Sequence, residues 1–180
     1  QRQMCIRDSF TCPNRDGKVS RGGCIFCSEN GSGDFTATKL KSIHEQIEEQ
    51  IDLVSKKYKG DKYIAYFQNF TNTYAEVSYL RKIYQEALSH EKIVGLAIAT
   101  RPDCLGDDVL ELLAELNKKT FLWVELGLQT LNDDVAKYFN RAYETEIYKE
   151  ASEKLIKELY NAKTNEYRIA LSKALSTIYN

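Results

Sequence analysis

The sequence lacks a surplus of basic residues: its 25 Lys and Arg are balanced by 26 Asp and Glu, and the net charge is −1. The composition therefore gives no independent support for binding to nucleic-acid phosphates. No apolar run approaches the ~20 residues that span a bilayer, so no membrane partner is expected. The first residues also lack a basic stretch followed by an apolar core, which is the pattern of a secretory signal. We therefore expect a soluble, cytoplasmic protein.

Cysteine is scarce and unevenly placed. The chain has five cysteines, an odd number that makes a disulfide framework an awkward interpretation. Cys12, Cys24 and Cys27 cluster in a glycine-rich loop, whereas Cys5 and Cys104 stand alone. In a reducing compartment such a cluster indicates a metal site more often than a disulfide.

Three buried strands are predicted at residues 63–67, 93–99 and 121–124. Each is a nearly continuous apolar run, which is typical of parallel strands covered on both faces. The strands start 30 and 28 residues apart, and a stripe of apolar residues with helical spacing lies between each pair. This is the repeat of an α/β fold. Neither glycine nor proline occurs from residue 128 to 180, and two helical stripes in this stretch predict a helical C-terminal part.

The spacing of the clustered cysteines limits their chemistry. Two cysteines separated by two residues occur in zinc ribbons, redox dithiols and iron–sulfur proteins alike, so Cys24 and Cys27 alone discriminate little. A closed zinc site has four ligands. No fourth ligand is evident, since His44 and His90 lie on predicted helices at no ligand-like spacing. Three thiolates instead leave one iron of a 4Fe-4S cluster open to a small molecule. A zinc-binding module without catalytic activity and a purely structural iron–sulfur module remain as alternatives.

Four strings of the sequence occur in an order that resembles a known family. They are FTCPNRDGKVSRGGCIFCSENGSGDF from Phe10, AYFQNFTNTYA from Ala65, IATRPDCL from Ile98 and ELGLQT from Glu125. Together they resemble the radical SAM superfamily and, more narrowly, a small subfamily related to the catalytic subunit of Elongator. The resemblance implies an α/β fold, a truncated partial (βα)6 TIM-like barrel with parallel strands.

The resemblance also implies cofactors and a reaction. Cys12, Cys24 and Cys27 would hold a 4Fe-4S cluster, which would cleave S-adenosyl-L-methionine reductively to a 5′-deoxyadenosyl radical. That radical would modify a substrate that the sequence does not identify. The relationship to Elongator brings RNA into consideration, although the charge does not support it. An electron donor such as flavodoxin or ferredoxin is implied as a partner.

Polar residues that follow the predicted strands are candidates for contact with the cofactor, because function collects at the carboxyl ends of parallel strands. By resemblance, the segment after the first of these strands lies near the methionine amine, later positions face the ribose or the substrate, and an arginine meets a carboxylate. With the aromatic residue that precedes the last cysteine, the candidates are Phe26, Asn69, Thr71, Asn72, Arg101, Glu125 and Gln129.

Structural roles compete with these assignments. Arg101 and Asp103 are equally compatible with a salt bridge around Pro102. Glu125, inside an apolar strand, needs a partner such as Arg101 if it is buried. Asn72 is also compatible with a helix cap.

Both ends of the chain depart from the family. Residues 1–9 resemble the translation of a sequencing adapter, so we expect them to be non-native and Cys5 to have no function. Residues 10–160 would form the partial radical SAM core, and residues 161–180 an unaligned helical tail. We therefore expect the first strand of the family, and its fifth and sixth strand units, to be missing.

Overall fold

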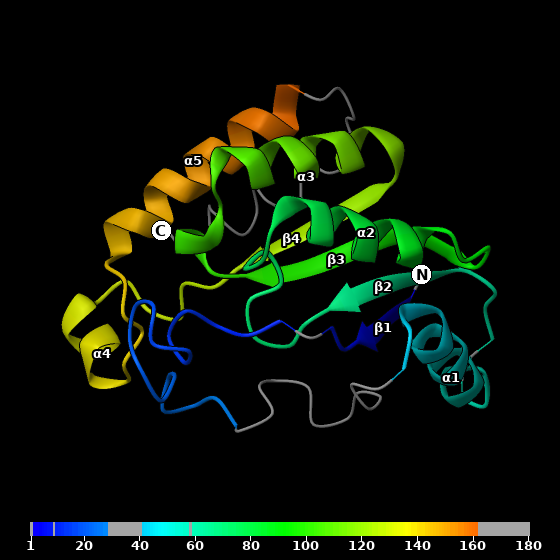
Figure 1. Cartoon of the computed structure of the whole chain (residues 1–180), viewed down its shortest axis with the longest axis horizontal. Helices are drawn as coiled ribbons and strands as arrows, with labels where there is room; N and C mark the ends of the chain where they lie inside the picture. Colours follow the sequence, from blue (N-terminus) through cyan, green and yellow to red (C-terminus); the bar gives the residue numbers. More distant parts are fainter. Residues whose placement is uncertain (1, 9, 29–40, 58, 162–180) are drawn as a thin grey trace.

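In the computed structural model, four parallel strands form one open sheet in the order β1-β2-β3-β4 (Figure 1). The structure describes residues 2–8, 10–28, 41–57 and 59–161. The strands are β1 Arg2–Ile6, β2 Tyr63–Phe67, β3 Ile93–Thr100 and β4 Phe121–Leu126. The fold is therefore α/β with parallel strands, as predicted, and the sheet is open, as expected of an incomplete barrel.

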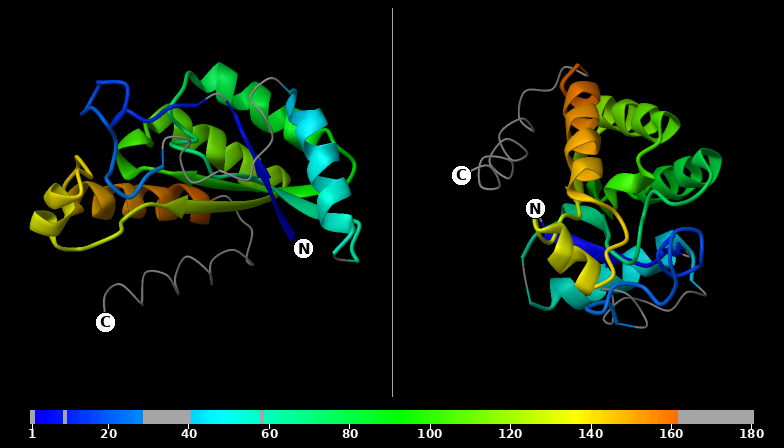
Figure 2. Two further views of the ribbon diagram at one scale, coloured as in Figure 1. Left: turned by 90° about the horizontal axis from the view of Figure 1, so that it is seen from below. Right: turned by 90° about the vertical axis from the view of Figure 1, so that its left-hand side faces the viewer.

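Helices alternate with the strands. They are α1 Ile43–Ser55, α2 Val77–Leu88, the short 3-10 helix Pro102–Cys104, α3 Asp107–Lys119, α4 Asp133–Tyr138 and α5 Thr145–Asn161. The end-on view shows α2, α3 and α5 on one side of the sheet (Figure 2). In the described part of the chain, no helix is both long and apolar enough to cross a membrane. The second of the two C-terminal stripes lies outside the described residues.

The first strand corrects one of our expectations. We expected it to be missing, but β1 pairs in parallel with β2 from Arg2 opposite Tyr63 to Ile6 opposite Phe67. Met4 and Ile6 are buried whereas Gln3 is exposed, so this segment has the period of two of a strand. The alternation is short and was overlooked. The non-native origin of residues 1–9 stays a prediction.

The two faces of the sheet differ in exposure at β4, whereas Ile64 of β2 and Ala97 of β3 are buried on the face that carries Trp123. On one face Leu122 and Val124 of β4 are buried against the core that α2, α3 and α5 complete. On the other face, among the described residues, Trp123 is 41% exposed and Glu125 is partly exposed. Neighbouring strands also approach each other closely. At Gly95 of β3, for instance, an added Cβ would lie 2.7 Å from the backbone oxygen of Phe121.

Because all four strands run the same way, their carboxyl ends share one edge of the sheet. The loops after β1, β2, β3 and β4 all begin at that edge (Figure 1). They carry the cysteines, the polar segment 68–73, the Arg101 region and Gln129 respectively. The fold thus brings together the candidates that the sequence spreads over more than 100 residues.

Candidate functional site

The cysteine loop is built from tight backbone turns. The carbonyl oxygen of Cys12 accepts hydrogen bonds from the backbone N–H groups of Arg15 (2.8 Å) and Asp16 (3.2 Å). Gly22 and Gly23 have φ values of 83° and 77°, in the left-handed region that glycine adopts without strain. The N–H of Cys27 bonds the carbonyl of Cys24 at 3.0 Å. These turns bring the three cysteines into one short loop, with Cys12 and Cys24 partly buried and Cys27 exposed.

A segment more than 110 residues later in the chain holds this loop in place. The side chain of Asn140 donates to the carbonyl of Gly23 at 2.8 Å. In return, buried Asn14 donates to the carbonyl of Asn140 at 2.6 Å and to Sγ of Cys24 at 3.4 Å. The backbone N–H of Ile25 also bonds the carbonyl of Phe139 at 3.1 Å. We call this set of contacts the loop clamp.

The aromatic residue between the last two cysteines belongs to the same contact. Phe26 packs edge-on against Phe139, with ring centroids 5.3 Å apart. Phe26 is 55% exposed, so about half of its surface remains open to a ligand or to solvent. The structure thus places Phe26 beside the loop clamp.

The thiols of this loop interact with one another. A hydrogen bond with Cys24 lowers the pKa of Cys27 to about 7, and the same bond raises the pKa of Cys24. The positive charge of Arg101 lowers the pKa of both to a smaller degree. By contrast, burial, helped by the charge of Asp103, raises the pKa of Cys104 to about 12, although this thiol lies within electrostatic range of Cys12. Since the thiolate is the form that binds metals, Cys27 is better prepared as a ligand than Cys104.

The segment that follows β2 contains buried polar atoms without partners. Asn69, Thr71 and Asn72 have no exposed surface. In the described part of the chain, no hydrogen bond reaches either amide atom of Asn69, the hydroxyl of Thr71 or Oδ1 of Asn72. Phe70 between them has a φ of 60°, an unusual conformation for a residue with a side chain. Strain and unpaired polar atoms of this kind gather at ligand sites.

Other bonds of this segment fix its position. The N–H of Thr71 donates to the carbonyl of Thr11, next to Cys12, at 3.3 Å. The amide of Asn72 donates to the carbonyl of Ala99 at 2.6 Å, and Tyr84 donates to the carbonyl of Asn72 at 2.5 Å. Asn72 is not a helix cap, since α2 begins after Glu76. The segment therefore lies directly beside the cysteine loop.

Arg101 forms a salt bridge with Asp103, which is the structural alternative to a role in ligand binding. It donates to both carboxylate oxygens of Asp103, at 2.9 and 2.7 Å, and to the carbonyl of Arg141 at 2.9 Å. Its guanidinium also lies over the ring of Tyr143, 4.9 Å from the centroid. Its donors are thus largely engaged within the protein, and its charge faces the cysteines.

Glu125 lies in β4 on the partly exposed face of the sheet, and Gln129 lies in the loop that follows β4. Glu125 does not pair with Arg101, the alternative that we weighed, but accepts a hydrogen bond from the hydroxyl of Tyr66 at 2.5 Å. Burial, together with this carboxylate, raises the pKa of Tyr66. Gln129 has a φ of 64°, is exposed, and accepts from Tyr143 at 3.3 Å.

Sequence reasoning missed the residues that assemble this site. Arg141 is 1% exposed and donates to the carbonyls of Leu128, Thr130 and Tyr143 and to the side chains of Asp133 and Thr145. The only signal for it was a charged residue outside any helical stripe, which is a weak one. Asn140 and Asn14 gave no signal, because their partners are distant in sequence.

Comparison with models of known protein families identifies the family of this chain. The model of the Radical SAM superfamily matches residues 12–168, from the first clustered cysteine to beyond α5. The chain belongs to the radical SAM superfamily.

Several curated proteins resemble this radical SAM chain. Uncharacterized protein YtqA of Bacillus subtilis is 48% identical over 155 residues, which are 86% of this chain and 48% of YtqA. Protein YhcC of Escherichia coli is 42% identical over 152 residues, 84% of this chain and 48% of YhcC. Uncharacterized protein MJ0486 of Methanocaldococcus jannaschii is 36% identical over 138 residues, 74% of this chain and 41% of MJ0486. The chain thus spans about half the length of the curated relatives it matches.

Among solved structures, the archaeal Methanocaldococcus infernus Elp3 with an N-terminal deletion is similar. The TM-score is 0.48 and the sequence identity is 21%, over 59% of this chain and 29% of that one.

Proposed function

We propose that Cys12, Cys24 and Cys27 hold a 4Fe-4S cluster and that the parent protein uses it to cleave S-adenosyl-L-methionine reductively. The observation that carries the proposal is the meeting of two features at one edge of the sheet. Three cysteines lie in a single loop, and beside them lie buried amide and hydroxyl atoms without partners. Belonging to the radical SAM superfamily supports both halves of the assignment.

The residues present fit these two cofactors. Thiolates are the protein ligands of iron–sulfur clusters, and Cys27, with a pKa lowered to about 7 by its hydrogen bond with Cys24, supplies one near neutral pH. When bound, such a cluster offers one iron without a protein ligand to the amino and carboxylate groups of S-adenosyl-L-methionine, together with an electron that breaks a C–S bond. A ligand with an amine, a carboxylate and ribose hydroxyls also satisfies amide and hydroxyl groups such as those of Asn69, Thr71 and Asn72.

The chain's own residues would bind the two cofactors and hold them in position. Thr71 and Asn69 offer donors and acceptors from a segment whose backbone is tied to the cysteine loop through Thr11. The loop clamp fixes the loop from the other side, through Asn140. Arg101 keeps a positive charge facing the thiolates while Asp103 and the carbonyl of Arg141 hold its guanidinium still. Groups held in this way need not reorganise when the ligand binds.

The remaining parts of the reaction belong to the parent protein. We propose an electron donor such as flavodoxin or ferredoxin, which would supply the reducing electron, and radical modification of a substrate still to be identified. RNA is one candidate class, although the net charge of −1 gives it no support.

Metal analysis after anaerobic reconstitution tests the proposal. We expect about four iron and four sulfide per chain, a change in the spectrum of the reduced cluster when S-adenosyl-L-methionine is added, and formation of 5′-deoxyadenosine. Cys24→Ala should abolish cluster assembly, whereas the matched variant Cys104→Ala should retain full iron content. Full iron in Cys24→Ala would overturn the ligand assignment.

The same experiment separates the two alternatives. One zinc per chain without visible absorbance would identify a zinc-binding module. A cluster whose spectrum ignores S-adenosyl-L-methionine, and that yields no 5′-deoxyadenosine, would identify a structural iron–sulfur module.

A further inference from the structure

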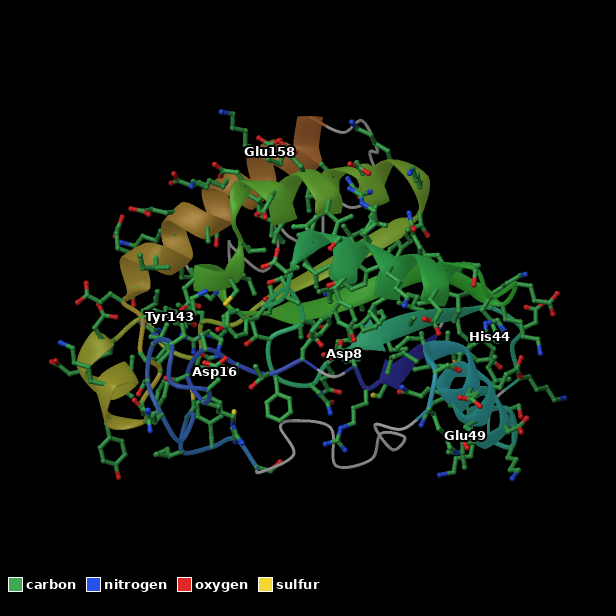
Figure 3. All side chains as sticks on the ribbon, viewed as in Figure 1. Asp8, Asp16, His44, Glu49, Tyr143 and Glu158 are labelled. Atoms are coloured by element: carbon green, nitrogen blue, oxygen red, sulfur yellow. The ribbon has the colours of Figure 1, made fainter. Side chains whose placement is uncertain are left out.

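A second group of metal-ligating side chains lies at the opposite end of the sheet. Figure 3 shows His44 at the end where the strands begin, far from Asp16 of the cysteine loop and from Tyr143. His44 and Glu48 lie on α1, and His90 lies in the turn between α2 and β3. One ligand atom from each of the three lies within 4.8 Å of the other two. The sequence gave no hint of this, because His44 and His90 are 46 positions apart.

The geometry of the three side chains suits one metal ion. Residues four apart on a helix share a face, so His44 and Glu48 point to the same side of α1. His90 completes the set: its Nε2 lies 2.9 Å from Oε1 of Glu48, and its ring centroid lies 4.8 Å from that of His44. In a tetrahedral zinc site the ligand atoms lie about 3.3 Å apart, because each is ~2.0–2.1 Å from the ion. Rotation of the exposed His44 side chain closes the remaining gap.

We propose that His44, Glu48 and His90 form a second metal site, separate from the cysteine loop, that binds a divalent transition-metal ion such as Zn²⁺. Two imidazoles and one carboxylate favour zinc, copper or nickel over calcium or magnesium, which prefer oxygen ligands alone. His44 and Glu48 are exposed, so an ion reaches the site from solvent, while His90 is 3% exposed and gives a fixed anchor. Three protein ligands leave a fourth position to water.

Binding requires one change in hydrogen bonding. In the structure, the backbone N–H of Lys92 donates to Nδ1 of His90, so a neutral ring carries its proton on Nε2, directed at Glu48. Coordination through Nε2 moves this proton to Nδ1 and loses the Lys92 bond. The positive charge of Lys92 also lies near Glu48 and opposes an ion weakly. Both effects lower the affinity, and we therefore expect a micromolar rather than a nanomolar site.

Occupation of this site would join two parts of the chain. The ion would tie α1 to the turn that precedes β3, and the residues between the outer ligands would form a closed loop. A nearby contact already holds α1 against α2, the helix that leads into this turn, since Glu86 of α2 accepts from the N–H of Ile43 at 2.9 Å. We expect a metal-dependent rise in thermal stability with little movement of the backbone.

Zinc titration of the full chain tests the site once the cysteine loop has been disabled. Cys24→Ala removes the central thiol, so micromolar zinc binding that remains and depends on His44 and Glu48 reports on the second metal site. We expect one Zn²⁺ per chain by calorimetry, and at least tenfold weaker binding after His44→Ala or Glu48→Gln is added. Asp52→Asn, which removes an exposed carboxylate from the same helix, is the matched control and should leave the affinity unchanged.

The outcomes are independent of the proposed function, because the iron content of the unaltered chain reports on the cysteine loop alone. Cu²⁺ bound to the Cys24→Ala chain should show electron-paramagnetic coupling to two imidazole nitrogens, and His44→Ala should remove one of them. Absence of zinc binding in Cys24→Ala, or equal affinity with and without His44→Ala, would overturn the second metal site.

Discussion

Two buried polar regions of this molecule differ in whether their polar atoms have hydrogen-bond partners within the protein. Arg141, which is 1% exposed, uses its donors on three carbonyls, a carboxylate and a hydroxyl. Asn69 and Thr71, equally buried, leave both amide atoms and the hydroxyl without partners in the described part of the chain. The first region is complete within the protein. The second lacks such partners among the described residues, which is the arrangement expected if a ligand supplies them.

The energetics of this difference distinguish structure from function. A buried polar group without a partner costs about 1–3 kcal/mol, so such atoms are retained where something else compensates. The loop after β2 carries several of them next to the cysteine loop, whereas the segment after α4 carries a saturated network. We therefore interpret the loop after β2 as the ligand side of the site, and the Arg141 network as the support that holds the loop clamp.

The largest expected effect is on the saturated region. Arg141→Met should lower the free energy of unfolding by about 3–5 kcal/mol, because it removes the five hydrogen bonds that the buried guanidinium donates, each worth about 1 kcal/mol. Urea denaturation of the two chains measures the difference. Lys137→Met, which removes an exposed cation from α4, should change stability by less than ~0.5 kcal/mol. Equal losses in the two variants would show that the network contributes nothing special.

Much of the fold could be predicted from the sequence because it depends on local periodicity. The strands at 63–67, 93–99 and 121–124 appear as β2, β3 and β4, the two helical stripes between them appear as α2 and α3, and the first C-terminal stripe appears as α5. The strand β1 was missed because two buried side chains in five residues make a weak pattern. The helix α4 was missed because six residues complete less than two turns.

The candidate site was predictable only in part. Motifs identified the cysteines and the polar residues after each strand, since parallel strands bring these ends together. The loop clamp could not be predicted, because Asn14 and Asn140 are paired by the fold and not by spacing. Likewise, Glu125 pairs with Tyr66 and not with Arg101, a choice that side-chain directions on neighbouring strands decide.

Two threonines of the loop after β2 allow a direct comparison. The hydroxyl of Thr73 donates to the carbonyl of Cys104 at 2.6 Å and lies 2.6 Å from that of Thr100. Thr73→Val should therefore lower the free energy of unfolding by about 1–3 kcal/mol, because the buried hydroxyl of Thr100 and the partly buried carbonyl of Cys104 lose this partner. The hydroxyl of Thr71 has no hydrogen-bond partner among the described residues, so Thr71→Val breaks no such bond. The cofactor-free chain should therefore keep its stability within ~0.5 kcal/mol.

For ligand affinity the order should be the reverse, with the larger effect from Thr71→Val. We expect Thr71→Val to weaken binding of S-adenosyl-L-methionine to the reconstituted protein about tenfold, the equivalent of ~1.4 kcal/mol. Thr73→Val should leave that affinity nearly unchanged once the chain is folded. A loss of stability in Thr71→Val equal to that in Thr73→Val would mean that the first hydroxyl is structural, and would remove the distinction between the two regions.

The loop clamp links the two regions and should have an intermediate effect. Asn140→Gly keeps the left-handed backbone, with φ at 58°, but removes the side chain that holds Gly23. The expected loss of stability is about 1 kcal/mol for the lost hydrogen bonds. Iron should pass to a chelator several-fold faster from the reconstituted variant, because the cysteine loop opens more often. Asn132→Gly, which removes the side-chain cap of α4, controls for general loosening of this part of the chain and should not speed iron release.

The smallest effect is expected where a polar pair is neither fully buried nor fully open. Tyr66→Phe removes the hydrogen bond to Glu125, but Glu125 is partly exposed and recovers water in its place. We expect a loss of only about 0.5 kcal/mol in the free energy of unfolding, measured in urea. The bond holds the carboxylate across the open face of the sheet, so its loss should act mainly on ligand affinity if Glu125 faces the ribose. Unaltered affinity of this variant for S-adenosyl-L-methionine would show that Glu125 has a structural role, like the groups bonded to Arg141. The loop after β2 would then be the one region of the two that contacts the ligand.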